Sequence, residues 1–163
     1  MWVLFAALWI VEGDAGIAHC PDNACRLAHW NREIAEALET GDVSGAGHVV
    51  RRIKGVEVLP PSHPERVLLE GNLGALQLAR GDSAGALRHF ELAWRSRAGM
   101  LGPEIPKLLN NWALALLAAG RPKDARAKLE AALAYCEPGA DAAALTVLRA
   151  NLATVAAIEA RRR

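Results

Sequence analysis

The feature that most constrains this chain is a motif that returns every 39 or 40 residues. Asn72, Asn111 and Asn151 are separated by 39 and 40 residues. Gly81 and Gly120 keep the 39-residue offset. Chance periodicity in an alanine-rich chain rarely aligns several landmarks at once. A period of this length is typical of repeat proteins, in which each copy is one supersecondary unit.

Each copy has the pattern of a helix, a short turn and a second helix. An apolar stretch with helical spacing runs up to the glycine, a charged or small turn follows, and a second such stretch begins. In the first clear copy, Phe90 and Ala93 fall on the apolar stripe of the second helix. Gly74 and Ala86 are small enough for the two helices to approach closely. The sequence therefore predicts antiparallel helix hairpins.

The large and small residues of these copies resemble the tetratricopeptide repeat family. The matching positions are Leu73, Gly74, Gly81, Ala86, Phe90 and Ala93 in one copy, and Trp112, Ala113, Leu116, Gly120, Ala125, Leu129 and Ala132 in the next. The spacing is most similar to the longer-period variant found in kinesin light chains. The resemblance covers roughly residues 30 to 160. It implies an all-α fold, a right-handed α-solenoid of antiparallel helix hairpins with about seven helices.

The flanking segments keep parts of the pattern. Upstream, Trp30 holds the family spacing, but Glu33 and Ile34 replace the large apolar and the small residue, which predicts a degenerate repeat. Downstream, Asn151 opens a lone helix that would cap the array, and terminal units of solenoids are often atypical. The predicted organisation is a candidate signal peptide over 1–18, the degenerate repeat within 19–58, and repeats over 64–163, divided into 64–99, 103–137 and a capping helix over 141–163.

Charge and motifs argue against several classes of function. The chain has 19 basic and 18 acidic residues, whereas a phosphate-binding surface normally has a clear basic excess. We therefore expect no nucleic-acid partner. The serines lie outside any nucleophile-elbow pattern and the five histidines are scattered. We expect no catalytic residues, no enzymatic activity and no cofactor.

The first 18 residues differ from the rest of the chain. Trp2 to Val11 is an almost unbroken apolar run, and Gly16-Ile17-Ala18 resembles a signal-peptide cleavage site, although the first basic side chain is Arg26. Cys20 also stands where a lipoprotein signal would place its lipid, but His19 occupies a position that normally holds a small residue, so we expect simple secretion. The run is shorter than the roughly 20 residues of a membrane span, so we expect no stable span. The expected location is periplasmic or secreted; the alternative is a cytoplasmic protein with a buried N-terminal helix.

Two cysteines enclose a short loop after that segment. Cys20 and Cys25 are close enough in sequence to form a disulfide in an oxidising compartment. His19 and His29 flank them and suggest an alternative metal site. The spacing matches no zinc module, and no paired cysteines stand elsewhere, so we expect no metal.

The tetratricopeptide resemblance also implies where a partner binds. In that family the first helix of each unit lines a concave groove, and the asparagine before the large apolar residue often hydrogen-bonds the backbone of an extended peptide. Here those positions are Asn72, Asn111 and Asn151. An amide donates to a peptide C=O and accepts from a peptide N–H, so it holds a strand without contacting its side chains.

Neighbouring positions of the expected groove give a largely apolar lining with one cation. They include Leu68, Lys107, Leu114 and Val147. This lining predicts a partner segment rich in aliphatic side chains. An alternative role for the asparagines is to bond across adjacent helices and fix the stacking of the repeats.

The sequence leaves three functions open. The first is a protein–protein interaction module that binds an extended peptide or a partner subunit in the groove. The second is a non-catalytic scaffold subunit that assembles through its outer helices into a larger complex or a homodimer, with Trp94 as a docking residue unless it packs in the core. The third is a small exported metal-handling protein built on the histidines and cysteines near residue 20.

Overall fold

The computed structural model describes residues 20–53, 59–100, 102, 104–136 and 142–161. Within these ranges the chain contains seven α-helices, a three-residue 3-10 turn and no strand. The α-helices are α2 (Asn23–Glu39), α3 (Val43–Arg52), α4 (Pro64–Ala79), α5 (Ser83–Arg95), α6 (Glu104–Ala118), α7 (Pro122–Ala134) and α8 (Ala142–Ala160). The prediction of an all-α chain with about seven helices is confirmed for the described residues.

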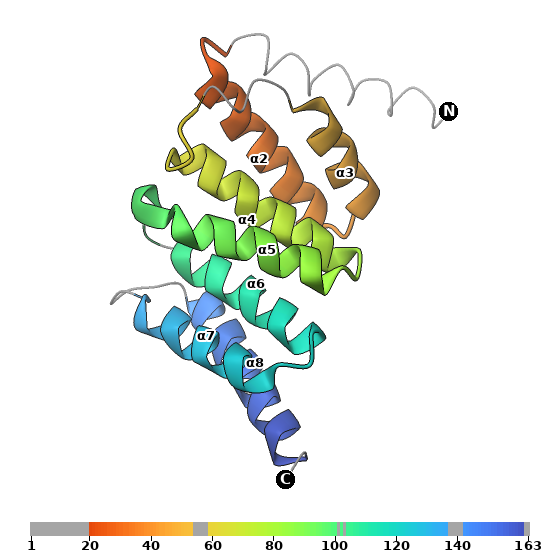
Figure 1. Ribbon diagram of the computed structural model, residues 1–163, viewed down its shortest axis with the longest axis vertical. Helices are drawn as coiled ribbons and strands as arrows, with labels where there is room; N and C mark the ends of the chain where they lie inside the picture. The colour runs from red at the N-terminus through yellow and green to blue at the C-terminus, as the bar shows by residue number, and fades with distance from the viewer. Residues whose placement is uncertain (1–19, 54–58, 101, 103, 137–141, 162–163) are drawn as a thin grey trace.

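The helices follow one another along the long axis of the molecule, with α2 and α3 at one end and α8 at the other (Figure 1). Turns of three residues join α2 to α3, α4 to α5 and α6 to α7. The members of each pair pack against each other, and α8 packs on α7. The described chain is therefore three helix hairpins followed by a single helix.

A glycine in the left-handed region closes each hairpin turn. The φ angle is 78° at Gly41, 82° at Gly81 and 74° at Gly120. In the second turn the N–H of Asp82 donates back to the carbonyl of Gln77 at 2.9 Å, which satisfies a free carbonyl at the helix end. A residue with a Cβ would lose about 1–2 kcal/mol in this conformation. This requirement explains why glycine recurs at the period of the repeat.

The first hairpin, predicted to be degenerate, is built like the second. Asp42 and Asp82 cap α3 and α5 by accepting a hydrogen bond from the N–H three residues on, at 2.8 Å in each case. Ile34, at a position expected to be small, is fully buried in a cluster with Ala46 of α3. Ala46 matches Ala86 of the second hairpin, and the smaller Val50, which packs against this cluster, stands where the second hairpin has Phe90.

The second hairpin shows the predicted close approach. A Cβ on Gly74 would lie 2.6 Å from a ring carbon of Phe90. Phe90 is fully buried, so the space left by the glycine of α4 is filled by the ring from α5. In the third hairpin Ala113 and Leu129 hold the corresponding positions, and both are fully buried in one cluster.

α8 completes the core at its end of the molecule. Leu148 and Val155 join the cluster formed by α6 and α7, and Arg126 Nε of α7 donates to Glu159 Oε2 of α8 at 2.9 Å. Among the described residues α8 is the one helix long and apolar enough to cross a membrane, with a mean hydropathy of 1.3. Length and composition of a single helix are weak evidence for a membrane span, and Leu148 and Val155 of α8 pack in the protein core.

Two segments fall at the edges of the described ranges. The candidate signal peptide over 1–18 and His19 lie outside them. The connection from α3 to α4 contains Pro60 and Pro61 and ends where α4 begins at Pro64. His63 Nδ1 accepts from the N–H of Glu65 at 3.2 Å. Proline suits this first helical position because its missing N–H would have no partner there.

Candidate functional site

A groove of about 300 Å³ lies among α2, α4 and α6. Four of the predicted partner-binding residues line it: Leu68 and Asn72 from α4, and Lys107 and Asn111 from α6. The lining also includes residues that the sequence did not single out, among them Asn31, Arg32, Glu65, Gly71, Met100 and Leu108. The groove therefore follows the first helices of the three hairpins.

Two of the three predicted asparagines join neighbouring first helices. Asn72 Nδ2 of α4 donates to the backbone oxygen of Asn31 at 3.1 Å and to its Oδ1 at 3.2 Å. Asn151 Nδ2 of α8 donates to Oδ1 of Asn110 in α6 at 2.8 Å. In both cases the partner is an asparagine 41 residues earlier. At these two positions the amide nitrogen has the stacking role that was the alternative to peptide binding.

The middle position of this series is different. Asn31 and Asn110 each lie 10 residues before the glycine of their hairpin turn. The residue at that position in the second hairpin is Gly71, which has no side chain to pair with Asn111. Asn111 Oδ1 accepts from Asn110 Nδ2 at 3.3 Å, but its own Nδ2 makes no hydrogen bond within the described part of the chain. The groove therefore contains an amide with two free N–H donors beside a glycine.

The base of the groove at the α2 end is a satisfied polar network. Asn31 is only 5% exposed, and its Nδ2 donates to the backbone oxygen of Glu65 at 2.8 Å and to Glu65 Oε2 at 2.9 Å. A buried amide without such partners would cost about 1–3 kcal/mol. Neither Asn31 nor Glu65 was predicted from the sequence. The signal was the 41-residue spacing of asparagines, which links Asn31 to Asn72 as it links Asn110 to Asn151.

The charged residues of the groove balance in sign. Arg32 and Lys107 are basic, and Glu65 and Glu104 are acidic. Lys107 Nζ lies 3.2 Å from Oε1 of Glu39, but these side chains are 65% and 66% exposed. An ion pair so exposed contributes little, typically about 0–1 kcal/mol. We therefore expect amide hydrogen bonds and apolar contacts, and not ion pairs, to contribute most to ligand binding in the groove.

Three predicted partner-binding residues lie outside this groove. Leu114 is half-buried on α6 and is not part of the lining. Val147 and Asn151 are on α8, one helix beyond α6, and Val147 is 51% exposed. The groove does not reach α8, and the predicted role of these three residues in partner binding stays a prediction.

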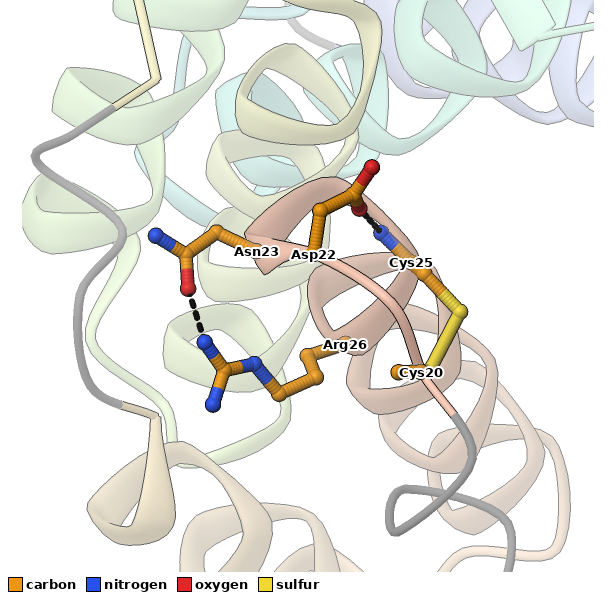
Figure 2. The surroundings of a disulfide bond; sticks show 5 residues. All are labelled: Cys20, Asp22, Asn23, Cys25 and Arg26. Carbon is orange, nitrogen blue, oxygen red and sulfur yellow. Dashed lines mark hydrogen bonds between the residues drawn. A yellow bond between two sulfur atoms is a disulfide. The ribbon is translucent and has the colours of Figure 1, made fainter.

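A disulfide joins Cys20 and Cys25 at the start of α2, with a Cα–Cα distance of 5.4 Å (Figure 2). Asp22 inside the loop caps α2 by accepting from the N–H of Cys25 at 2.8 Å. Arg26, one turn after Asn23 on α2, donates to the side-chain oxygen of Asn23. The loop is therefore held by a covalent bond and by a helix cap.

The disulfide bears on the metal-handling alternative. Both sulfur atoms are bonded to each other and are not thiolates, which are the ligands that zinc takes from cysteine. His29 Nε2 is 3.3 Å from Glu33 Oε1, one turn along the same helix. The described residues contain no group of three or more histidine, cysteine or acidic side chains placed to hold a metal ion.

Comparison with known proteins adds no relative: the chain matches no protein-family model, no curated protein and no solved structure. The resemblance to tetratricopeptide repeats therefore depends on the residues and on the recurrence of the hairpin turns.

Proposed function

We propose that this protein is a right-handed α-solenoid of the tetratricopeptide type that binds an extended peptide segment of a partner protein in the groove among α2, α4 and α6. The observation that carries the proposal is the unpaired amide nitrogen of Asn111 beside Gly71. The equivalent nitrogens of Asn72 and Asn151 are used in pairs between helices. Asn111 is the one asparagine of this series with both donors of its amide nitrogen left for a ligand.

The recurrence of one geometry supports the solenoid. The same left-handed glycine turn closes three hairpins, and the same asparagine pair joins the first helices at both ends of the array. When each unit is related to the next in the same way, repetition generates a superhelix with a continuous inner surface.

The chemistry of the groove supports an extended peptide as its ligand. Asn111 Nδ2 can donate to a peptide C=O, and Asn72 Oδ1, which accepts no hydrogen bond in the described part of the chain, can accept from a peptide N–H. Leu68, Met100 and Leu108 supply apolar surface for aliphatic side chains. An extended backbone presents both polar groups in alternation, as a helix does not.

The test uses peptides selected by display against the full chain, followed by calorimetry on purified variants. Asn111→Ala removes the free donors. Gly71→Asn supplies the missing partner, so it should pair with Asn111 and fill the groove at the same point. Arg88→Ala, an exposed change on α5 outside the groove, is the matched control. Circular dichroism would confirm equal helicity in all four proteins.

We expect both groove variants to weaken the selected peptides by about tenfold or more, as loss of a hydrogen bond and burial of an unpaired peptide group require. Arg88→Ala should bind as wild type does. Peptides that bind all four proteins equally would place the interface elsewhere, on the outer helices of a scaffold subunit. That result would refute groove recognition while leaving the fold intact.

We also propose that the protein is exported, because a disulfide such as Cys20–Cys25 persists in oxidising compartments and is rare in the cytosol. Intact mass of the protein recovered from its native cell tests this proposal. Export predicts loss of residues 1–18 and a mass lower by two hydrogen atoms than that of the reduced form. A full-length chain with free thiols would contradict it.

A further inference from the structure

A second hollow, of about 390 Å³, lies between α5 and α7 and shares no lining residue with the groove. Leu87 comes from α5, Trp112 and Leu116 from α6, and Ala127 and Lys128 from α7. These residues give an apolar and aromatic wall with one amine. The volume falls within the range of about 300–1,000 Å³ that is common for small-ligand sites.

The amine of Lys128 lies against the aromatic wall of this hollow. Its Nζ is 3.7 Å from the ring centroid of Trp112 and 5.7 Å from that of Trp94. The two indoles meet edge to face, with centroids 6.3 Å apart, and Trp94 also contacts Tyr135 in the same way. This aromatic cluster gives Trp94 a packing role, and it fixes the position of the lysine.

The acidic residues of the hollow already have partners. Glu91 pairs with Arg95 on α5. Asp124 Oδ2 accepts from Arg121 Nε at 2.7 Å. Lys128 forms no ion pair with a carboxylate in the described part of the chain; its partners there are the two indole rings. The lining thus has one positive charge that no acidic side chain pairs with.

We propose that this hollow binds a carboxylate carried on a planar apolar body. The carboxylate would pair with Lys128, and the body would lie against Trp112, Leu116 and Leu87. This site is separate from the peptide groove, and it does not depend on the proposed function. Two sources offer the same chemistry: a free aromatic acid, and an aromatic side chain beside an acidic one in a partner protein.

The state of Lys128 in the absence of a ligand supports this assignment. Burial lowers its pKa below the usual value of 10.5, Arg97 lowers it further, and Asp124 and Glu91 act in the opposite direction. A carboxylate bound beside the amine would stabilise the ammonium form and move the pKa of Lys128 upward. That change is a spectroscopic readout that belongs to one residue.

The experiment is NMR of the full chain labelled with ¹³C-lysine, in which the lysines are Lys54, Lys107, Lys123 and Lys128. Lys128→Met assigns the Lys128 Cε signal, because methionine keeps an unbranched apolar stem over the indole. The probes are phenylacetate, acetate, 2-phenylethylammonium and a capped Phe-Asp dipeptide. Acetate lacks the apolar body, and the ammonium compound has the same body with the opposite charge.

We expect phenylacetate or the dipeptide to shift the Lys128 signal saturably and to raise its pKa, with acetate and the ammonium compound at least about tenfold weaker. Tighter binding of phenylacetate would identify a free acid as the ligand, and tighter binding of the dipeptide would identify a partner protein. Lys128→Met and Leu87→Trp, which fills the hollow from the opposite wall, should each reduce binding by about tenfold or more.

Lys123→Met, an exposed change on the same helix outside the hollow, should bind the probe as wild type does. Equal shifts with all four probes, or equal binding by Lys123→Met and Lys128→Met, would overturn the assignment. Leu87→Trp covers the case in which Lys128→Met fails to fold, since it leaves the amine in place.

Discussion

Two glycines three residues apart in α4 give a direct test of the packing, because replacing each with alanine should change stability differently. Gly71 and Gly74 both lie in the interior of α4. Each substitution therefore gains the same intrinsic helix propensity, about 1 kcal/mol. What differs between the two variants is the space that the new methyl group enters.

At Gly71 a Cβ would meet only Leu108 Cδ1, at 3.7 Å, which is an ordinary van der Waals contact. At Gly74 a Cβ would lie 2.6, 2.8 and 2.9 Å from three ring carbons of the buried Phe90. Overpacking of this kind costs about 1–3 kcal/mol. The propensity gain cancels in the comparison, so Gly71→Ala should be more stable than Gly74→Ala by about 1–3 kcal/mol.

Urea unfolding followed by circular dichroism measures this difference, provided that the dependence of the unfolding free energy on urea is equal in the two variants. Gly71→Ala should unfold at a higher urea concentration than wild type, and Gly74→Ala at an equal or lower one. Adding Phe90→Leu to Gly74→Ala should recover part of the loss, because the smaller side chain leaves room for the methyl group. Equal midpoints for the two alanine variants would refute the close approach of α4 and α5.

Three further predictions concern the amides, the disulfide and the half-buried amine of Lys128. Asn31→Ala removes the buried amide at the base of the groove and should cost about 1–3 kcal/mol in urea unfolding, whereas Asn111→Ala should stay within about 0.5 kcal/mol of wild type. Cys25→Ser opens a loop with ends five residues apart. It should cost about 2 kcal/mol, and reductant should then have no further effect on the unfolding midpoint. Burial lowers the pKa of Lys128 from 10.5, so the unfolded state holds more protons just below that pH. Relative to Lys128→Met, wild-type stability should rise with pH as the pH approaches 10.5 from below, as urea midpoints measured over that range would show.

Much of the hairpin architecture could be predicted because it depends on residues close together in the chain. Gly81 and Gly120 mark turns that need a left-handed residue, and this requirement is visible in any sequence with such a period. The regularity of the first hairpin was underestimated because Ile34 was compared only with the small residue that the family has at this position. Val50 packs against the cluster of Ile34 at the place where the second hairpin has Phe90, and a larger residue on one helix can be matched by a smaller residue on its partner.

The groove was harder to predict because its character depends on contacts between residues about 40 positions apart. Asn72, Asn111 and Asn151 occupy the same place in the repeat, so the sequence motif gives them the same role. Their environments differ through the residue that faces each one from the preceding unit. Asn31 and Asn110 face two of them, and Gly71 faces the third.

The presence of a glycine at position 71 is not explained by the stability of the fold. Glycine inside a helix is less stable than alanine by about 1 kcal/mol. At Gly74 the close approach of Phe90 explains this cost, but at Gly71 a methyl group would meet only an ordinary contact with Leu108. Stacking does not explain it either, because an asparagine there would form the pair seen on both sides of it. What the glycine provides is an open groove and an unpaired amide nitrogen on Asn111, and for this reason we propose ligand recognition at the middle of the array.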